Sequence, residues 1–344
     1  MVRSPFHPAQ CARGARFGEV NGLELPLDYG DWLAEHHAVR EACGLLDRST
    51  RGRLVVTGED RLSWLQGMLS NDLRPLEAGA PSVQACALDA TGHLLSDVIV
   101  AARPDSLLLD VPRENVEALF HHLERFIVTE RVEIVEQSGF LAGLSVQGPA
   151  ADESALRAVV GGSALLVPAD HTGEGGFDLY LPVADAEAAW IRLVDSGIAP
   201  VGETAAETLR IEAGIPRWGI DMDATTIPLE CGLGPSHISH TKGCYLGQEV
   251  IHRIYARGHT NRTLVGFLVD GPELPTRGDR VLWMEGDTAR EVGWTTSATH
   301  SPSLAASIAL GYVRREHAAP GTHLRTQNSV PLTVTLLPFL RSRS

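Results

Sequence analysis

The stretch HTKGCYLGQEVIHRIYARGH, residues 240–259, separates two regions of the chain that differ in sequence pattern. Before it, segments with helical periodicity alternate with short apolar runs typical of strands. After it, short strand-like runs are separated by glycine, proline, aspartate and asparagine, and no helical pattern exceeds two turns. We therefore predict an α+β region over residues 1–260 and a small all-β domain, a barrel or a sandwich, over residues 261–344.

The first region contains patterns of both secondary-structure types. The two apolar arms of residues 83–102 flank the turn DATG, in which Gly92 occupies the position that tolerates a positive φ, so this segment predicts a hairpin. Short strands are also predicted at 52–58, 140–149 and 176–182. Helices are predicted at 31–43, 59–69, 113–127, 150–160, 184–196 and 203–212.

The composition is that of a globular chain, with 344 residues, 44% hydrophobic residues and a formal net charge of −14. Such an acidic chain has no general attraction for nucleic acid or anionic lipid, although a local basic patch would still bind an anion. No apolar run approaches the ~18 residues of a membrane helix. Five cysteines without zinc-ligand spacing, and an N-terminus without an apolar segment, indicate reduced thiols, no bound metal and a cytoplasmic location.

Cys244 is the first candidate catalytic residue, because a thiol beside glycines and cations is in a setting that favours the reactive thiolate. Lys242 and Arg253 would stabilise that anion, and the flanking glycines would let another molecule approach the sulfur. Gln248 adds hydrogen-bonding capacity nearby. The alternative is a buried structural cysteine in a tight loop, since free cysteine is among the most buried residue types.

Two aspartates are candidates for contacts with a ligand. Asp97 lies among apolar residues in the second arm of the hairpin, where a carboxylate either faces solvent or sits in a pocket as a base or acceptor. Asp178 follows the glycine-rich segment TGEGG. A carboxylate there would pair with the N–C–N edge of a pterin or a guanine, and the alternative is an ordinary hairpin loop.

A group of basic residues follows the cysteine motif. Arg253, Arg257, His259 and Arg262 lie close together in the sequence. Such a group would bind an anion, such as a phosphate or a polyglutamate tail. A solvated linker between domains is the equally simple alternative.

The motif KGCYLGQE, residues 242–249, resembles the signature of the YgfZ-type folate-binding proteins. These proteins are related to the T-protein of the glycine cleavage system, an aminomethyltransferase. The resemblance runs through most of the chain, including REACGLLDRSTRGRLVVTGED (40–60), TGEGGFDLYLP (172–182) and LRIEAGIPRWGIDMDATTIPLE (209–230).

The resemblance implies a fold of two interleaved α+β units and a C-terminal β-barrel, arranged as a three-domain ring with a central channel. The channel would bind tetrahydrofolate or a one-carbon derivative of it. Asp97 falls on the aspartate that faces the reacting folate nitrogen, and Asp178 on a pterin-holding glutamate. An arginine of the T-proteins falls on Ala206, which removes one expected contact. Asp97, Asp178, Lys242, Gln248 and Arg253 together are the predicted cofactor-binding set.

For the function, the resemblance to the YgfZ group implies a folate-binding accessory protein for the assembly or repair of iron–sulfur clusters. Cys244 would be its reactive or ligating thiol, because thiolate is the natural ligand of iron–sulfur clusters. The partners would be folate and iron–sulfur client enzymes, and the protein would be a monomer. The alternatives are a tetrahydrofolate-dependent aminomethyltransferase and a non-catalytic folate sensor.

Overall fold

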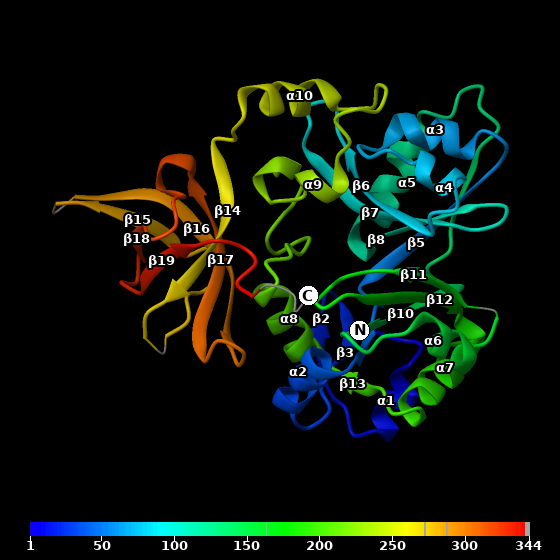
Figure 1. Ribbon diagram of the computed structural model, residues 1–344. Helices are drawn as coiled ribbons and strands as arrows, with labels where there is room; N and C mark the ends of the chain where they lie inside the picture. The colour runs from blue at the N-terminus through cyan, green and yellow to red at the C-terminus, as the bar shows by residue number, and fades with distance from the viewer. Residues whose placement is uncertain (163, 272, 287, 341–344) are drawn as a thin grey trace.

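The computed structural model describes residues 1–162, 164–271, 273–286 and 288–340. Two five-stranded sheets with helices form the larger part of the molecule, and a six-stranded barrel stands beside them (Figure 1). The architecture is α+β with a C-terminal barrel, as predicted. Among the described residues, no helix combines the length and the apolar character needed to cross a membrane.

The first sheet contains the predicted hairpin. Alternate residues such as Val98 and Val100 face one core, where they pack with Leu65 of α3 (Arg61–Met68) and Leu119 of α5 (Val116–Glu124). The turn glycine, Gly92, has a φ of +80°, as the sequence pattern requires. In spatial order the strands are β6 (Ser82–Leu88), β7 (Leu94–Ala102), β8 (Leu107–Pro112), β5 (Arg51–Thr57) and β9 (Glu133–Glu136), and a short helix, α4 (Arg74–Glu77), packs beside β6.

The second sheet is built from segments on both sides of the first in the sequence. In spatial order its strands are β11 (Leu165–Pro168), β12 (Gly176–Pro182), β10 (Leu141–Gln147), β4 (Gly44–Asp47) and β13 (Ala199–Val201). The chain enters this sheet with β4, leaves to form the first sheet, and returns with β10, so the two units are interleaved. Its helices are α2 (Trp32–Glu41), α6 (Glu153–Val160), α7 (Val183–Asp195) and α8 (Glu203–Glu212).

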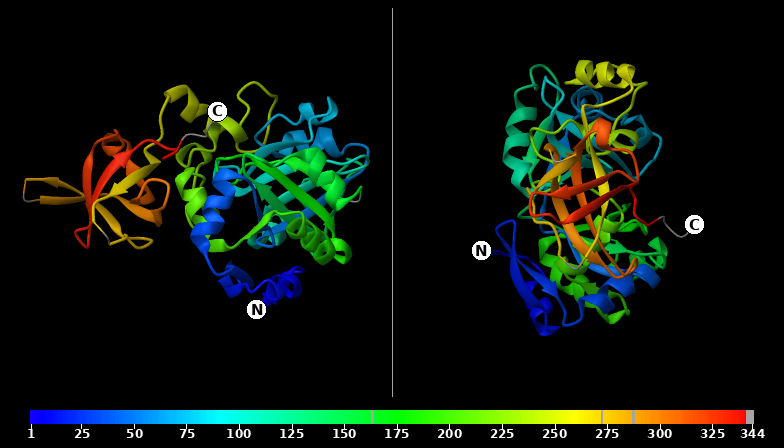
Figure 2. Two further views of the ribbon diagram at one scale, coloured as in Figure 1. Left: turned by 60° about the horizontal axis from the view of Figure 1, so that its bottom comes forward. Right: turned by 90° about the vertical axis from the view of Figure 1, so that its left-hand side faces the viewer.

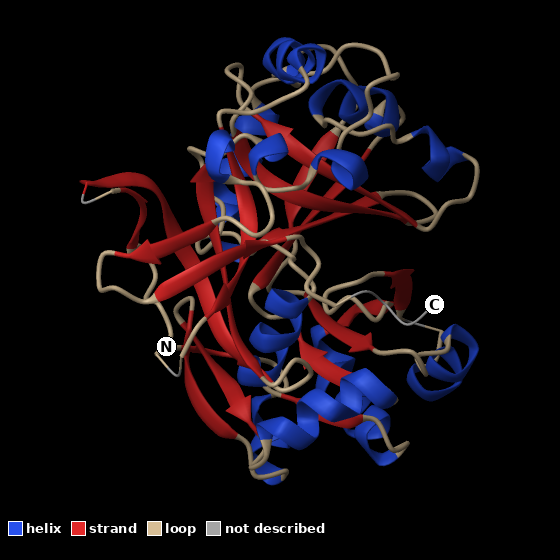
Figure 3. Cartoon of the chain, turned by 60° about the vertical axis from the view of Figure 1, so that its left-hand side comes forward, coloured by secondary structure: helices blue, strands red, loops and turns tan. Residues whose placement is uncertain are grey.

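The C-terminal strands close into a barrel, which decides between the two all-β alternatives. Phe267 is fully buried at the centre of its core. Figure 3 shows the strands of the molecule in red and its helices in blue. Helix α8 contacts β16 and β17 of the barrel. In spatial order the strands are β14 (Arg262–Val269), β17 (Ala306–Arg314), β16 (Thr288–Ser301), β15 (Arg280–Glu285), β18 (His323–Thr326) and β19 (Pro331–Thr335).

Several elements were not predicted from the sequence, among them α4, β4, β9, β11 and β13, the N-terminal residues and the stretch between the two regions. The N-terminal residues form α1 (His7–Ala12) and a three-stranded sheet of β1 (Val2–Arg3), β3 (Leu23–Asp28) and β2 (Arg16–Val20). They lie at one edge of the molecule in Figure 2, where α1 contacts α7 and β3 contacts α8. The stretch between the two regions forms α9 (Gly234–His237) and α10 (Gln248–Arg257). Helix α10 buries only Ile251, so it contributes little to the core. Three 3₁₀ turns lie at Arg113–Asn115, Pro228–Glu230 and Arg315–His317.

A buried polar network joins the helices of the second unit to the barrel. The carboxylate of Glu212, at the end of α8, is fully buried and accepts hydrogen bonds from His36 Nε2 at 2.8 Å and Ser301 Oγ at 2.5 Å. Arg40 also pairs with it. Burial acts to raise the pKa of Glu212, but the hydrogen bonds from His36, Ser301 and Arg40 outweigh burial and hold that pKa below its usual value.

We predict that Glu212→Gln lowers the free energy of unfolding by about 3 kcal/mol at neutral pH, because the change removes a fully buried charge that pairs with His36 and Arg40 and leaves Arg40 with Glu174 as its counter-charge. A folded-state pKa below the unfolded value contributes stability above the unfolded pKa, and this stability is lost as pH falls through the folded pKa. The variant should therefore lose less stability on acidification than the wild type. Denaturant unfolding across the acidic range measures both effects.

Glu249→Gln is the matched control, because that side chain is 86% exposed in its pair with Arg253. It should change stability by less than about 0.5 kcal/mol. Equal effects of the two substitutions would contradict the assignment of Glu212 as the anchor between α8 and the barrel.

Candidate functional site

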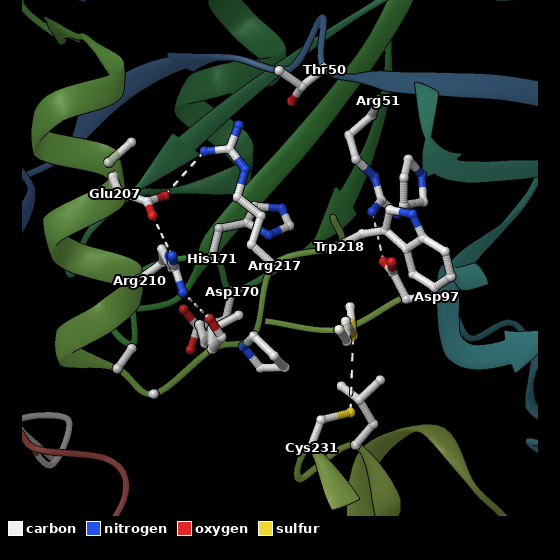
Figure 4. A pocket seen from close by; sticks show the side chains of 18 of the residues that line it. Thr50, Arg51, Asp97, Asp170, His171, Glu207, Arg210, Arg217, Trp218 and Cys231 are labelled. Atoms are coloured by element: carbon white, nitrogen blue, oxygen red, sulfur yellow. Dashed lines mark hydrogen bonds and ion pairs between the residues drawn. The ribbon is translucent and has the colours of Figure 1, made fainter. Parts of the chain in front are cut away.

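A cavity of about 600 Å³ lies where the two sheets and the barrel meet. This volume is in the range of sites that bind cofactors and drug-sized molecules. Arg51 and Asp97 line it from the first sheet, His171 from the second unit, and Leu264 from the barrel. Figure 4 shows Arg51 and Asp97 together on one side of the cavity, with His171 and Arg217 on the other.

Asp97 lies on the cavity wall, and its carboxylate is only partly used by the protein. Its Oδ2 accepts a hydrogen bond from Arg51 Nη1 at 2.6 Å, and its side chain is 15% exposed. Its Oδ1 is buried and has no hydrogen-bond partner among the described residues. A buried carboxylate oxygen without a donor is costly, so the site has the property expected of one completed by a ligand N–H group.

Arg51 fixes this carboxylate in place. Its Nε donates to Asp110 Oδ1 at 2.5 Å, and its Nη2 donates to the Asp110 carbonyl at 2.8 Å. Burial acts to lower the pKa of Arg51, but the charges of Asp97 and Asp110 outweigh it and raise the pKa above its usual value. The guanidinium therefore stays charged between two carboxylates, of which only Asp97 lines the cavity.

His237 is a further cavity residue near Asp97 that the sequence analysis missed. Burial lowers the pKa of His237, and the charge of Asp97 only partly opposes this effect. Its Nδ1 lies 2.7 Å from Ser236 Oγ. A neutral imidazole beside a carboxylate is suited to accept or pass on a proton.

Ala206 lines the cavity on α8, at the position where the resemblance implied a lost arginine. Arg217 lies against the same stretch of helix, and its Nη1 donates to Glu203 and to Glu207 at 3.1 Å each. Since these two carboxylates flank position 206, a guanidinium is present on this wall from a different part of the chain. The cavity wall near Ala206 therefore still carries a positive charge, which is that of Arg217.

Asp178 lies in β12 and is 1% exposed, so it does not line the cavity itself. Its carboxylate accepts hydrogen bonds from His171 Nε2, at 2.9 and 3.0 Å, and His171 is the residue that lines the cavity. Asp178 is therefore separated from the cavity by His171.

Lys242 is placed as a structural residue rather than as a cofactor contact. It is the only lysine of the chain, and its side chain is buried. Its Nζ donates to the carbonyls of Gln66, Leu69 and Asn71 at 2.6, 2.7 and 2.7 Å. These three bonds use all three N–H groups and tie the loop before α10 to the end of α3.

The other predicted residues of the motif also lie outside the cavity. Cys244 is exposed, so the alternative of a buried structural cysteine is wrong. Gln248 begins α10 and accepts a hydrogen bond from the Tyr245 amide at 2.9 Å. Arg253 is exposed and pairs with Glu249 one turn away. Of the predicted set, the structure brings only Asp97 to the cavity, with Asp178 directly behind His171.

The fold of two interleaved α+β units and a C-terminal barrel is shared with a solved aminomethyltransferase, which places the chain in an aminomethyltransferase-like class. The chain belongs to the glycine cleavage T-protein family. The GCVT N-terminal domain matches residues 6–164 and 155–236, and the glycine cleavage T-protein C-terminal barrel domain matches residues 262–340. The family uses tetrahydrofolate, so the predicted cofactor is confirmed.

The chain is similar over its whole length to curated aminomethyltransferases. That of Rubrobacter xylanophilus is 34% identical, over 99% of this chain and 95% of the relative. That of Halothermothrix orenii is 30% identical, over 99% of this chain and 100% of the relative. The solved structure of the glycine cleavage system aminomethyltransferase T from Bartonella henselae is 25% identical, with a TM-score of 0.87 over 99% of this chain and 98% of that one.

These relatives contradict the accessory function in iron–sulfur assembly or repair that the sequence analysis put first. Full-length relatives at 30–34% identity carry the name aminomethyltransferase, which was the alternative. The structure supplies a physical reason for the correction. Cys244 stands alone at the surface, away from the cavity.

We predict that Lys242 resists amine-reactive esters in the native protein, on the order of 100-fold more slowly labelled than in the guanidinium-unfolded chain. The reagent needs a free, accessible amine, and the three carbonyl contacts must open first. Burial lowers the pKa of Lys242 to about 8, so the amine would react readily if it were accessible. Because the chain has one lysine, peptide mass spectrometry reports this site directly. Fast native labelling would contradict the buried placement.

Proposed function

We propose that this protein is a tetrahydrofolate-dependent aminomethyltransferase, which moves the carbon of an aminomethyl group from a carrier thiol, such as a lipoyl group, to tetrahydrofolate. The full-length similarity to proteins of that name supports the reaction class. The clamped carboxylate of Asp97, at the wall of a cavity of suitable size, supports the location of the chemistry.

The free oxygen of Asp97 is the single observation on which the proposal rests most. Arg51 occupies one carboxylate oxygen, and the other is buried without a donor. A secondary amine N–H is the group that such an oxygen would accept. The fixed carboxylate would then orient the amine nitrogen and take up its proton as the nitrogen forms its new bond.

The proposed reaction balances without an oxidant or a reductant. The methylene carbon breaks its bonds to sulfur and to the amino nitrogen, and it forms two bonds to nitrogen atoms of the acceptor. The sulfur leaves as a thiol and the amino group as ammonia, and they take up the two protons that the acceptor nitrogens give up. Tetrahydrofolate, when bound, supplies those two nitrogen atoms. Asp97 and the neighbouring neutral His237 are the chain's groups for holding and passing these protons.

The proposal also covers the arrangement of the domains, the cellular location and the oligomeric state. We propose that the two α+β units and the barrel form a three-domain ring around a central channel, with the chain divided into 1–260 and 261–344. The cavity lined from all three parts supports this arrangement. We also propose a cytoplasmic monomer. The motif at 242–249 supports an affiliation with the YgfZ-type subgroup as a matter of sequence, without its iron–sulfur function.

We predict that Asp97→Asn lowers kcat by roughly 10²–10⁴-fold, because the amide keeps the shape of the carboxylate but cannot take up a proton. The assay uses the purified protein, a lipoyl carrier bearing the aminomethyl group, and tetrahydrofolate. Methylenetetrahydrofolate and ammonia are both measured.

The matched control is Asp105→Asn, at an exposed loop position, which should keep wild-type turnover. Cys244→Ser should also retain turnover within about 2-fold, because its sulfur lies outside the cavity. No product above background from the wild-type protein would rule out the aminomethyl transfer. Full turnover by Asp97→Asn would rule out this carboxylate as the reacting group.

A further inference from the structure

His171 lines the cavity from the segment between β11 and β12, and the surrounding structure fixes its position. Its backbone N–H donates to Gln147 Oε1 at 2.8 Å. The preceding residue, Asp170, accepts hydrogen bonds from the amides of Thr172 and Gly173, at 3.1 and 2.7 Å, which hold the start of the glycine-rich loop. The imidazole is therefore presented from a rigid support rather than from a free loop.

The residue behind this imidazole is the buried carboxylate of Asp178. Both of its oxygens lie within 3.0 Å of His171 Nε2, and its side chain is 2% exposed against 15% for the histidine. Tyr180 Oη donates to the same carboxylate at 3.4 Å. Burial acts to raise the pKa of Asp178, but the interaction with His171, together with the charge of Arg48, outweighs burial and holds the pKa below its usual value.

This arrangement decides which ring nitrogen carries the proton in the neutral imidazole. An ionised carboxylate only accepts hydrogen bonds, so Nε2 must be the N–H donor. The other nitrogen, Nδ1, then carries a lone pair, and it has no hydrogen-bond partner among the residues that the structure describes. A neutral histidine oriented by a buried carboxylate thus offers one acceptor to the cavity.

We propose that His171 determines ligand specificity: its Nδ1 accepts a hydrogen bond from the exocyclic amino group of an aminopyrimidine ring, with Asp178 as the residue that positions it. This inference rests on the proposed folate-dependent function and assigns the recognition of the pteridine ring to a residue that the comparisons do not name. A carboxylate at position 178 was expected to make two hydrogen bonds to the pterin edge. In the proposed arrangement His171 makes one hydrogen bond instead. The single acceptor, Nδ1, can pair with one amino group that projects from the ligand ring.

The charged groups near His171 favour a donor as its partner. Asp170 stands directly beside it, and Glu207 lines the same cavity. Arg48 and Arg217 are cations that line the same cavity: the charge of Arg48 acts on Asp178, and Arg217 Nη1 is already paired with Glu203 and Glu207. These carboxylates attract N–H groups and repel acceptor oxygens of a ligand. The wall therefore selects a ring with an amino substituent over a ring of the same shape without one.

The test compares the binding of tetrahydrofolate with that of an analogue in which methyl replaces the 2-amino group. Calorimetry is done at about pH 8, on the alkaline side of the usual histidine range, and without any aminomethyl donor. The wild type should prefer tetrahydrofolate by about 10-fold, the effect of losing one hydrogen bond to a buried acceptor. His171→Phe should reduce this ratio to about 1, within 2-fold, because the ring shape stays and the acceptor is lost.

Two further variants separate positioning from structure. Asp178→Asn should also abolish the preference, because an amide N–H donating to Nε2 would move the imidazole proton to Nδ1 and remove the acceptor. His171→Asn places an amide oxygen near the position of Nδ1 and should restore part of the preference. His121→Phe, at an exposed side chain of α5, is the matched control and should bind both ligands as the wild type does. Thermal melting identifies any variant that has failed to fold.

A wild-type preference that survives in both His171→Phe and Asp178→Asn would overturn the inference, and so would a wild type that binds the two ligands equally or binds neither. A different result would contradict the proposed transferase activity. A protein that discriminates the two ligands but forms no methylenetetrahydrofolate would keep His171 as the specificity residue and lose the reaction. Turnover without discrimination would keep the reaction and lose the specificity residue.

Discussion

A buried guanidinium shared by two carboxylates is the interaction on which the rest of the site depends. Arg51, at the start of β5, binds Asp110 on the neighbouring strand β8 and Asp97 on β7. A buried arginine without these partners would be strongly destabilising, so the charge fixes the relative positions of three strands. The same pairing leaves one oxygen of Asp97 available to a ligand. The position of that oxygen is therefore set by the ion pairs that neutralise Arg51 within the sheet.

The site is made by segments that meet only in the folded chain. The strands bring Asp97 to one side, the loop before β12 brings His171 to another, and α8 carries the carboxylates that bind Arg217. The polar network around Glu212 holds α8 against the barrel. Since the cavity is closed by parts of both sheets and of the barrel, its shape depends on that junction as well as on the residues that contact a ligand.

Much of the fold could be predicted from the sequence, and the site only in part. The hairpin with Gly92 has a strong local pattern, whereas α10 was not predicted and buries only one side chain. Asp97 was predicted because a carboxylate in an apolar strand is unusual. His171, Arg217 and His237 were missed, because their neighbours in the cavity come from distant parts of the chain. The surroundings of Cys244 suggested a reactive site, but the lysine there binds three backbone carbonyls.

The most direct measurement of the central claim is a crystal structure of the protein with bound tetrahydrofolate. The account predicts the pteridine in the cavity lined by Arg51 and His171, with a ring N–H within about 3.2 Å of Asp97 Oδ1. A pteridine bound beside Cys244, or one in the cavity that leaves Asp97 Oδ1 without a donor, would contradict it.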